Sequence, residues 1–168
     1  MPRLLVVHHS PTPTMQALTA SVLAGARDDE IEGVDVIDVP ALDFATGRAG
    51  AADLLAADGY LLGTSANFGS MSGALKHVFD STFLEIGGAL DADGGAGGSA
   101  GTTGGRPVGL YVHGRYDTTG AVRSVTAITG ALGWKQGYQH VEVLGDPSEA
   151  DHADAYTLGG TIAALLAG

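Results

Sequence analysis

The chain contains no cysteine among its 168 residues. A thiolate is the nucleophile of thiol phosphatases and arsenate reductases and a ligand of zinc–thiolate and iron–sulfur sites, so these chemistries are excluded. The N-terminal stretch MPRLLVVHHSPTP has only four consecutive apolar residues, and no apolar run approaches the roughly 18 residues that a membrane-spanning helix needs. We therefore expect no secretory signal, no membrane span and a cytoplasmic location.

Basic side chains are also scarce, with 8 Lys plus Arg against 19 Asp plus Glu and a net charge of −11. Such a surface repels phosphodiester backbones and anionic lipids, so neither nucleic acid nor a membrane is an expected partner. A metal site is not expected either. Adjacent His8 and His9 on a strand end point to opposite sides, and no carboxylate or third histidine lies at ligand spacing.

Glycine is the abundant residue type, with 27 in the chain. Nine of them fall in residues 87–105, GGALDADGGAGGSAGTTGG. This segment cannot bury enough side-chain surface to offset its ordering entropy, so we predict a flexible loop. The chain length and an apolar content of 45% fit one domain over residues 1–168, with the glycine-rich loop as an insertion in it.

Short apolar runs alternate with helical patterns along the chain. The runs expected to form buried strands are Leu4–Val7, Val34–Val39, Gly59–Gly63, Val108–Val112 and Val141–Leu144. Each is followed by a segment expected to contain a helix, so parallel strands must be joined by right-handed helical crossovers. We therefore predict an α/β fold with a doubly wound, five-stranded parallel sheet in the order 2-1-3-4-5 and helices on both faces.

Ligands of such sheets bind at the carboxyl ends of the strands, beside the point where the strand order reverses. The expected loops at residues 10–14, 64–71 and 113–120 meet there. The first loop places three hydroxyl groups and free amides at a helix N-terminus, which favours an anion; the alternative is that the hydroxyls only cap the helix. The loop lacks the Walker and dinucleotide patterns, so a nucleoside triphosphate or a Rossmann-bound NAD is not expected.

Residues 55–80, LAADGYLLGTSANFGSMSGALKHVFD, resemble the flavodoxin-like NAD(P)H:quinone oxidoreductases of the tryptophan-repressor-binding-protein (WrbA) type and the related NADPH-dependent FMN reductases. Those families share the pattern A-D-x-x-x-x-G-T-P-x-x-F-G-x-M. The matching positions are Ala57, Asp58, Gly63, Thr64, Phe68, Gly69 and Met71. Ser65 stands at the usual proline, and Asn67 stands where the quinone-reductase type often has arginine.

The resemblance implies a flavodoxin-like fold and bound FMN. The residues that match the phosphate loop are Ser10, Thr12, Thr14 and Met15; those that match the loop along the isoalloxazine ring are Ser65, Ala66, Asn67, Phe68, Gly69, Ser70 and Met71; those of the third loop are His113, Gly114, Arg115 and Tyr116. Gly69 permits close approach of the backbone to the ring, and Phe68 or Tyr116 can cover a ring face. Core positions for Phe68 and Met71, and an ordinary turn role for Gly69, are the alternatives.

The implied activity is that of an FMN-dependent oxidoreductase, with NAD(P)H as co-substrate and a quinone or similar small molecule as electron acceptor. The flavin carries the chemistry, so no catalytic side chain is required, although His113 can donate a proton or, alternatively, cap its loop. Arg115 or Arg48 can hold the phosphates of the dinucleotide. Two other functions stay open, a flavodoxin-like one-electron carrier and a cofactor-free assembly protein of this fold. A homodimer or homotetramer is the expected assembly.

Overall fold

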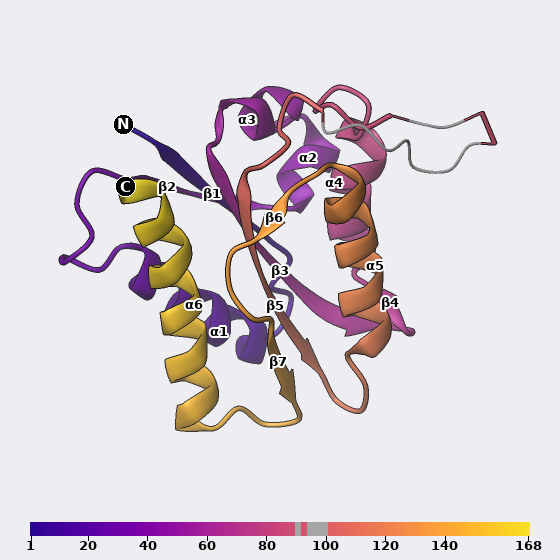
Figure 1. The fold of residues 1–168 in the computed structure, drawn as a ribbon. Coiled ribbons are helices and arrows are strands. Elements are labelled where there is room, and N and C mark those ends of the chain that lie inside the picture. Colours follow the sequence, from indigo (N-terminus) through magenta and orange to yellow (C-terminus); the bar gives the residue numbers. More distant parts are fainter. Residues whose placement is uncertain (90–91, 94–100) are drawn as a thin grey trace.

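The computed structural model of the protein describes residues 1–89, 92–93 and 101–168. Its centre is a parallel sheet with helices on both faces (Figure 1), which is the α/β architecture expected from the sequence. The strands, in spatial order, are β2 (Asp35–Pro40), β1 (Arg3–His8), β3 (Gly59–Asn67), β5 (Pro107–Gly114) and then β6 (Lys135–Gln136) and β7 (Val141–Leu144), which both pair with β5.

The predicted count of five strands is wrong, although the five predicted runs lie side by side in the expected order 2-1-3-4-5. The described residues form seven strands, with the path β2-β1-β3-β5-β6. One additional strand, β4 (Ser70–Met71), is the short return of a hairpin and pairs antiparallel with the end of β3. The other arises because the fifth strand is divided. β6 pairs with the start of β5 and β7 pairs with its end, and residues 137–140 separate them.

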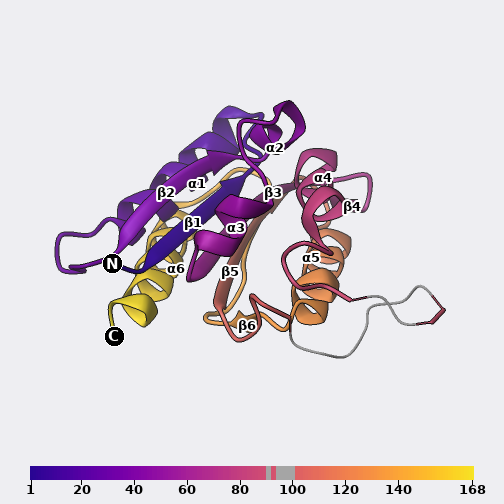
Figure 2. The ribbon, with the colours of Figure 1, turned by 90° about the horizontal axis from the view of Figure 1, so that it is seen from above.

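The described residues contain six helices, one more than predicted. They are α1 (Pro13–Ala26), α2 (Leu42–Thr46), α3 (Ala51–Ala56), α4 (Gly73–Thr82), α5 (Thr119–Ala131) and α6 (Glu149–Ala167). Two of them, α1 and α6, cover one face of the sheet, and the others pack on the opposite face (Figure 2). None of these helices is both long and apolar enough to cross a membrane.

The apolar run of β1 shows why the sheet is covered on both faces. Leu4 and Val6 pack into the core beneath α1 and α6, whereas Leu5 and Val7 pack into the core on the other face. All four side chains are buried, because successive residues of a strand point to opposite faces. Each such side chain contributes about 1.5–3 kcal/mol when fully buried. A continuous run, rather than an alternating one, therefore specifies a strand covered on both sides.

Within the glycine-rich segment predicted at residues 87–105, residues 90–91 and 94–100 lie outside the described part of the chain. Gly87 and residues 101–102, which are described, pack against each other. A Cβ atom added to Gly87 would collide with the backbone of Thr102, and one added to Gly101 would collide with the carbonyl group of Gly87. The segment therefore begins and ends at one place on the surface of the domain.

Candidate functional site

The carboxyl ends of β1, β3 and β5 lie side by side, as the strand order requires. Ser65 at the end of β3 pairs with His113 at the end of β5, and the N–H of His9 donates to the carbonyl oxygen of Gly63 at 3.0 Å. These contacts bring together the three loops that the sequence predicted to form a ligand site.

The loop from β1 to α1 contains both a helix cap and an unused amide. The side chain of Thr12 accepts a hydrogen bond from the amide of Met15 at 3.2 Å, and its carbonyl group accepts from the amide of Gln16 at 2.9 Å. Pro13 has no N–H group. The amide of Thr14 has no hydrogen-bond partner among the described residues. Thr12 therefore caps the helix, and Thr14 presents a free donor at the positive end of α1.

Ser10 points toward the interior of the domain. Its Oγ lies 2.8 Å from Nδ1 of His8 and 2.8 Å from Oγ1 of Thr19, which lies 2.8 Å from the hydroxyl of Tyr111. Burial raises the pKa of Tyr111, so this residue stays a neutral phenol. Nε2 of His8 lies 2.9 Å from Oδ1 of Asp38 without the alignment of a hydrogen bond. The Ser10 hydroxyl therefore anchors the loop to the core.

The second loop is the hairpin between β3 and β4. Phe68 and Gly69 form its two-residue turn, with φ values of 50° and 79°. Two positive φ values in a two-residue hairpin are typical of a type I′ turn, for which Asn-Gly is the preferred sequence. The ring of Phe68 is completely exposed, so Phe68 is not a core residue.

Hydroxyl groups hold the base of this hairpin. Oγ1 of Thr64 donates to the carbonyl oxygen of Ser65 at 2.8 Å and accepts from the amide of Ser72 at 2.9 Å. Oγ of Ser72 in turn accepts from the amide of Leu75 at 3.2 Å and caps α4. Oγ of Ser65 differs, because it is buried and finds no partner in the described part of the chain. A buried hydroxyl in this state costs about 1–3 kcal/mol, which a ligand group can recover.

The third loop follows β5. His113 is 8% exposed, and its Nε2 lies 2.8 Å from the carbonyl oxygen of Gly145. Since a carbonyl group only accepts, Nε2 carries the hydrogen, and Nδ1 can donate only in the imidazolium form. The hydrogen bond to Gly145 joins the third loop to the residue after β7. It corresponds to the alternative in which His113 caps its loop. Arg115 forms an exposed ion pair with Asp146 at 3.1 Å, and Tyr116 is 95% exposed.

The predicted site residues divide by burial. Exposed or half-exposed on the three loops are Ser10, Thr12, Thr14, Ala66, Asn67, Phe68, Gly69, Ser70, Arg115 and Tyr116; buried are Met15, Ser65, Met71, His113 and Gly114. The side chains of Met15 and Met71 belong to the two cores, so Met71 takes its core alternative. Arg48 pairs with Asp43 at 2.5 Å, and no hydrogen bond or ion pair joins it to a described residue of these loops.

His9 was not among the residues expected to contact a ligand, but it borders the first loop of the candidate site. Its Nδ1 is buried and no described residue bonds to it. Burial and the neighbouring His8 lower the pKa of His9, which favours the neutral ring. A pocket of about 280 Å³ opens beside it, lined by His8, His9, Ser10, Pro11, Pro40 and Leu42. Among the described residues, no group of His, Asp and Glu is arranged to hold a metal ion.

Comparison with known proteins gives a fold. No protein-family model and no curated protein matches the sequence. A flavodoxin of Streptococcus pneumoniae TIGR4 is similar over 97% of this chain and 99% of its own, with 18% identity and a TM-score of 0.70. A flavodoxin from the domain Archaea covers 98% of each chain, with 16% identity and a TM-score of 0.74. A WrbA-like flavodoxin from Agrobacterium tumefaciens covers 99% of this chain and 98% of its own, with 17% identity and a TM-score of 0.70. The predicted flavodoxin-like fold is thereby confirmed.

Proposed function

We propose that the protein is an FMN-binding oxidoreductase that takes electrons from NAD(P)H and passes them to a quinone or a similar small acceptor. The observation that carries the proposal is the turn at Phe68 and Gly69. Phe68 has a φ of 50°, a backbone conformation that costs residues other than glycine and asparagine about 1–2 kcal/mol. Its ring is exposed and makes no compensating contact with the core. Strained residues of this kind cluster at ligand sites.

The residues of the three loops fit the chemistry of FMN. The free amide of Thr14 at the N-terminus of α1 suits a phosphate group without a basic side chain. The unpaired hydroxyl of Ser65 suits the polar edge of the ring, and the exposed rings of Phe68 and Tyr116 offer flat apolar cover. When bound, FMN exchanges electrons with nicotinamides and with one- or two-electron acceptors.

The side chains around this site act by position. Thr64 and Ser72 hold the base of the hairpin, so the Ser65 hydroxyl keeps one place. His113 holds the third loop through Gly145, and we assign it a positioning role rather than that of proton donor. Arg115 is the basic side chain on the loops and suits the phosphates of an incoming dinucleotide, although that contact must compete with Asp146.

A second function, the one-electron carrier, is supported by two observations. Phe68 and Tyr116 are both almost completely exposed on neighbouring loops, and two aromatic rings can cover both faces of a flavin. The net charge of −11 also suits docking to a basic redox protein.

The test is reduction of the bound flavin by pyridine nucleotides. The cofactor is first released by heat from the protein as purified, or after reconstitution, and identified by chromatography. We expect FMN. Under anaerobic conditions, NADH or NADPH should then bleach the flavin within seconds to minutes in a stopped-flow experiment. Bleaching by dithionite but by neither nucleotide would favour the carrier, and the absence of tight flavin binding would reject both functions.

The substitution Phe68→Asn tests the turn itself. Asparagine suits a positive φ, so we expect the free energy of unfolding of the cofactor-free protein to rise by about 1 kcal/mol. Loss of the ring should weaken FMN binding by roughly three- to tenfold. Leu84→Asn is the control, because Leu84 is also exposed but lies outside the three loops. Unchanged FMN affinity in Phe68→Asn would show that this ring does not contact the flavin.

A further inference from the structure

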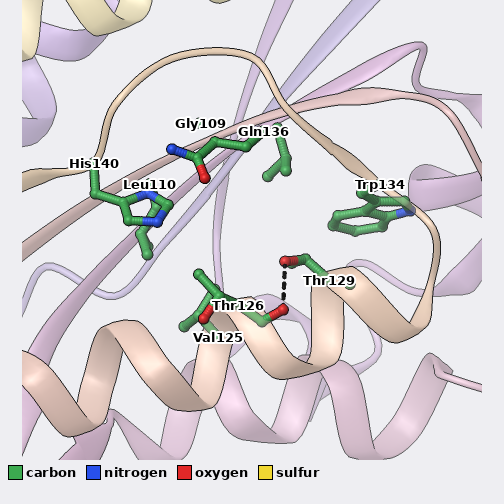
Figure 3. A pocket seen from close by; sticks show the side chains of 10 residues that line it. Gly109, Leu110, Val125, Thr126, Thr129, Trp134, Gln136 and His140 are labelled. Atoms are coloured by element: carbon green, nitrogen blue, oxygen red, sulfur yellow. Dashed lines mark hydrogen bonds between the residues drawn. The ribbon is translucent and has the colours of Figure 1, made fainter.

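The edge of the sheet contains a cavity that the proposed function does not use. β6 pairs with β5 at Pro107 and Val108, and β7 pairs with it from Tyr111 onward, so Gly109 and Leu110 lie opposite the break in the edge. The amide of Gly137 still donates to the carbonyl oxygen of Val108 in β5 at 2.9 Å, and residues 138–140 then leave the sheet. A cavity of about 180 Å³ lies between this break and α5 (Figure 3).

The walls of the cavity are apolar with a few polar groups. Leu110, Val125 and Trp134 line it from β5, α5 and the segment before β6. Figure 3 shows His140 and Gln136 on the side of the cavity opposite α5. Apart from the titratable ring of His140, none of the lining residues, all within the described ranges, has an ionisable side chain. A charged ligand would be desolvated there without a partner, so the cavity selects neutral molecules.

His140 lines the cavity, and neither nitrogen of its ring has a hydrogen-bond partner among the described residues. Its Nδ1 is buried, and no residue in the described part of the chain bonds to it. Burial lowers the pKa of His140 although Glu142 opposes this effect, so the ring is neutral at neutral pH. In a neutral imidazole, Nδ1 either donates or accepts, depending on the tautomer. A hydroxyl group does both, so it satisfies His140 in either tautomer.

Trp134 provides a rigid aromatic wall. Its ring stacks on Tyr60 with centroids 3.8 Å apart, and its Nε1 donates to Oγ1 of Thr103 at 2.8 Å. The indole is therefore fixed, and its N–H is not available to a ligand. A volume of about 180 Å³ is close to the roughly 150 Å³ of an engineered apolar cavity that binds benzene in another protein.

We propose that this cavity binds a small neutral phenol, a single aromatic ring with one hydroxyl group. The hydroxyl meets the imidazole ring of His140, and the aromatic ring of the phenol lies among Leu110, Val125 and Trp134. The cavity lies at residues 108–110 of β5, whereas the candidate flavin site begins at His113. The two sites are separate, and this binding does not depend on a flavin.

Trp134 makes the proposal directly measurable, because it is the single tryptophan of the chain. Phenol is titrated into the full-length protein as purified, and the emission of Trp134 is excited at the long-wavelength edge of its absorption, where phenol does not absorb. We expect a saturable change with phenol, a weaker one with toluene, which has the ring without the hydroxyl, and none with benzoate, which carries a charge. A thermal melt with and without phenol gives an independent measure of binding.

The substitution His140→Leu removes the polar group and keeps an apolar wall. Phenol should bind about three- to tenfold more weakly to this variant, while toluene binds at least as well. His77→Leu, at an exposed histidine of α4, is the matched control and should leave both affinities unchanged. Thr126→Leu, which narrows the cavity, should weaken both ligands.

Three results would overturn the proposal. The first is a linear change in emission that never saturates, since this indicates collisional quenching only. The second is equal phenol affinity in wild type and in the folded variants at His140 and Thr126. The third is a phenol-induced change in the visible spectrum of the bound flavin without a change in Trp134 emission, because phenol would then occupy the flavin site instead.

Discussion

Thr64 and Ser65 are adjacent in β3, but their hydroxyl groups differ in hydrogen bonding. Thr64 Oγ1 uses both its donor and its acceptor capacity, whereas Ser65 Oγ is buried without a partner in the described residues. Thr64→Val should therefore lower the free energy of unfolding by about 1–3 kcal/mol, because the amide of Ser72 loses its acceptor. Ser65→Ala should leave this energy unchanged or raise it by about 1 kcal/mol. Urea denaturation of the cofactor-free variants measures both.

The variants Thr64→Val and Ser65→Ala also separate an effect on protein stability from an effect on FMN binding. If Ser65 contacts the flavin, Ser65→Ala weakens FMN binding although the protein is no less stable. If Ser65→Ala instead loses as much stability as Thr64→Val, the Ser65 hydroxyl has a hydrogen-bond partner in solution.

His9 should make stability depend on pH. Its pKa is lowered in the folded protein, first by burial and then by His8. The unfolded chain therefore takes up the proton first as the pH falls. The stability that the neutral ring contributes is complete above the unfolded value of about 6.5 and is lost as the pH falls through the folded value. We expect the free energy of unfolding to decline as the pH falls below about 7, and His9→Gln to reduce that decline. His77→Gln, at an exposed histidine, serves as the control, and an identical decline in both variants would contradict this origin.

Local patterns predicted some residue roles and missed others. Thr12 could be recognised as a helix cap, because the capping pattern lies within four residues. The partners of Ser10 and His113 could not be predicted. Ser10 reaches Tyr111 through Thr19, and Thr19 and Tyr111 are 92 positions apart, while His113 and Gly145 are 32 apart. Contacts over such separations depend on the fold. The sequence could therefore predict that the three loops lie side by side, but not which of their polar groups already have hydrogen-bond partners.

The close contact between α1 and α6 depends on Gly159. Gly159 lies in the middle of α6, where glycine costs about 1 kcal/mol relative to alanine. A Cβ atom there would collide with the carbonyl oxygen of Val22 in α1. We expect Gly159→Ala to lower the free energy of unfolding by about 1–3 kcal/mol, because the two helices must move apart.

Gly130→Ala in α5 is the matched substitution, since a Cβ atom at Gly130 meets nothing within 4 Å. It should raise the free energy of unfolding by about 0.4–1 kcal/mol through the unfolded state. Thermal melts of the two variants give the comparison. Stabilisation by both substitutions would mean that α1 and α6 do not pack as closely as the glycine requires.

Elements were predictable where their apolar pattern was long enough. The runs in β1, β3 and β5 are buried on both faces and were located within a few residues of their ends. β4 and β6 have two residues each, too few to show any periodicity. β6 consists of exposed Lys135 and Gln136, so it lacks the apolar signal of a strand altogether. The division of the fifth strand, and with it the cavity, therefore could not be predicted from sequence.

The net charge of the whole molecule should decide how salt changes the rate of electron transfer in each of the two proposed functions. A protein with a charge of −11 repels an anionic dinucleotide, and salt screens this repulsion. The rate of flavin reduction by NAD(P)H should therefore rise about two- to tenfold between low salt and about 0.2 M. For a carrier that docks to a basic redox protein, the rate of electron exchange should fall over the same range. Stopped-flow traces at several salt concentrations measure the sign, and a decrease with NAD(P)H would contradict repulsion as the limiting effect.

The divided edge strand also affects how copies of the molecule meet at high concentration. A sheet edge exposes unpaired N–H and C=O groups that a strand of another chain can extend, which is a common first step toward fibres. On one edge, β6 and β7 offer only two and four residues with a break between them. On the other, β2 carries Asp35 and Asp38 and ends at Pro40, which cannot donate a backbone hydrogen bond. Neither edge presents a long, flat, apolar template, so strand addition between molecules is disfavoured on both sides of the sheet.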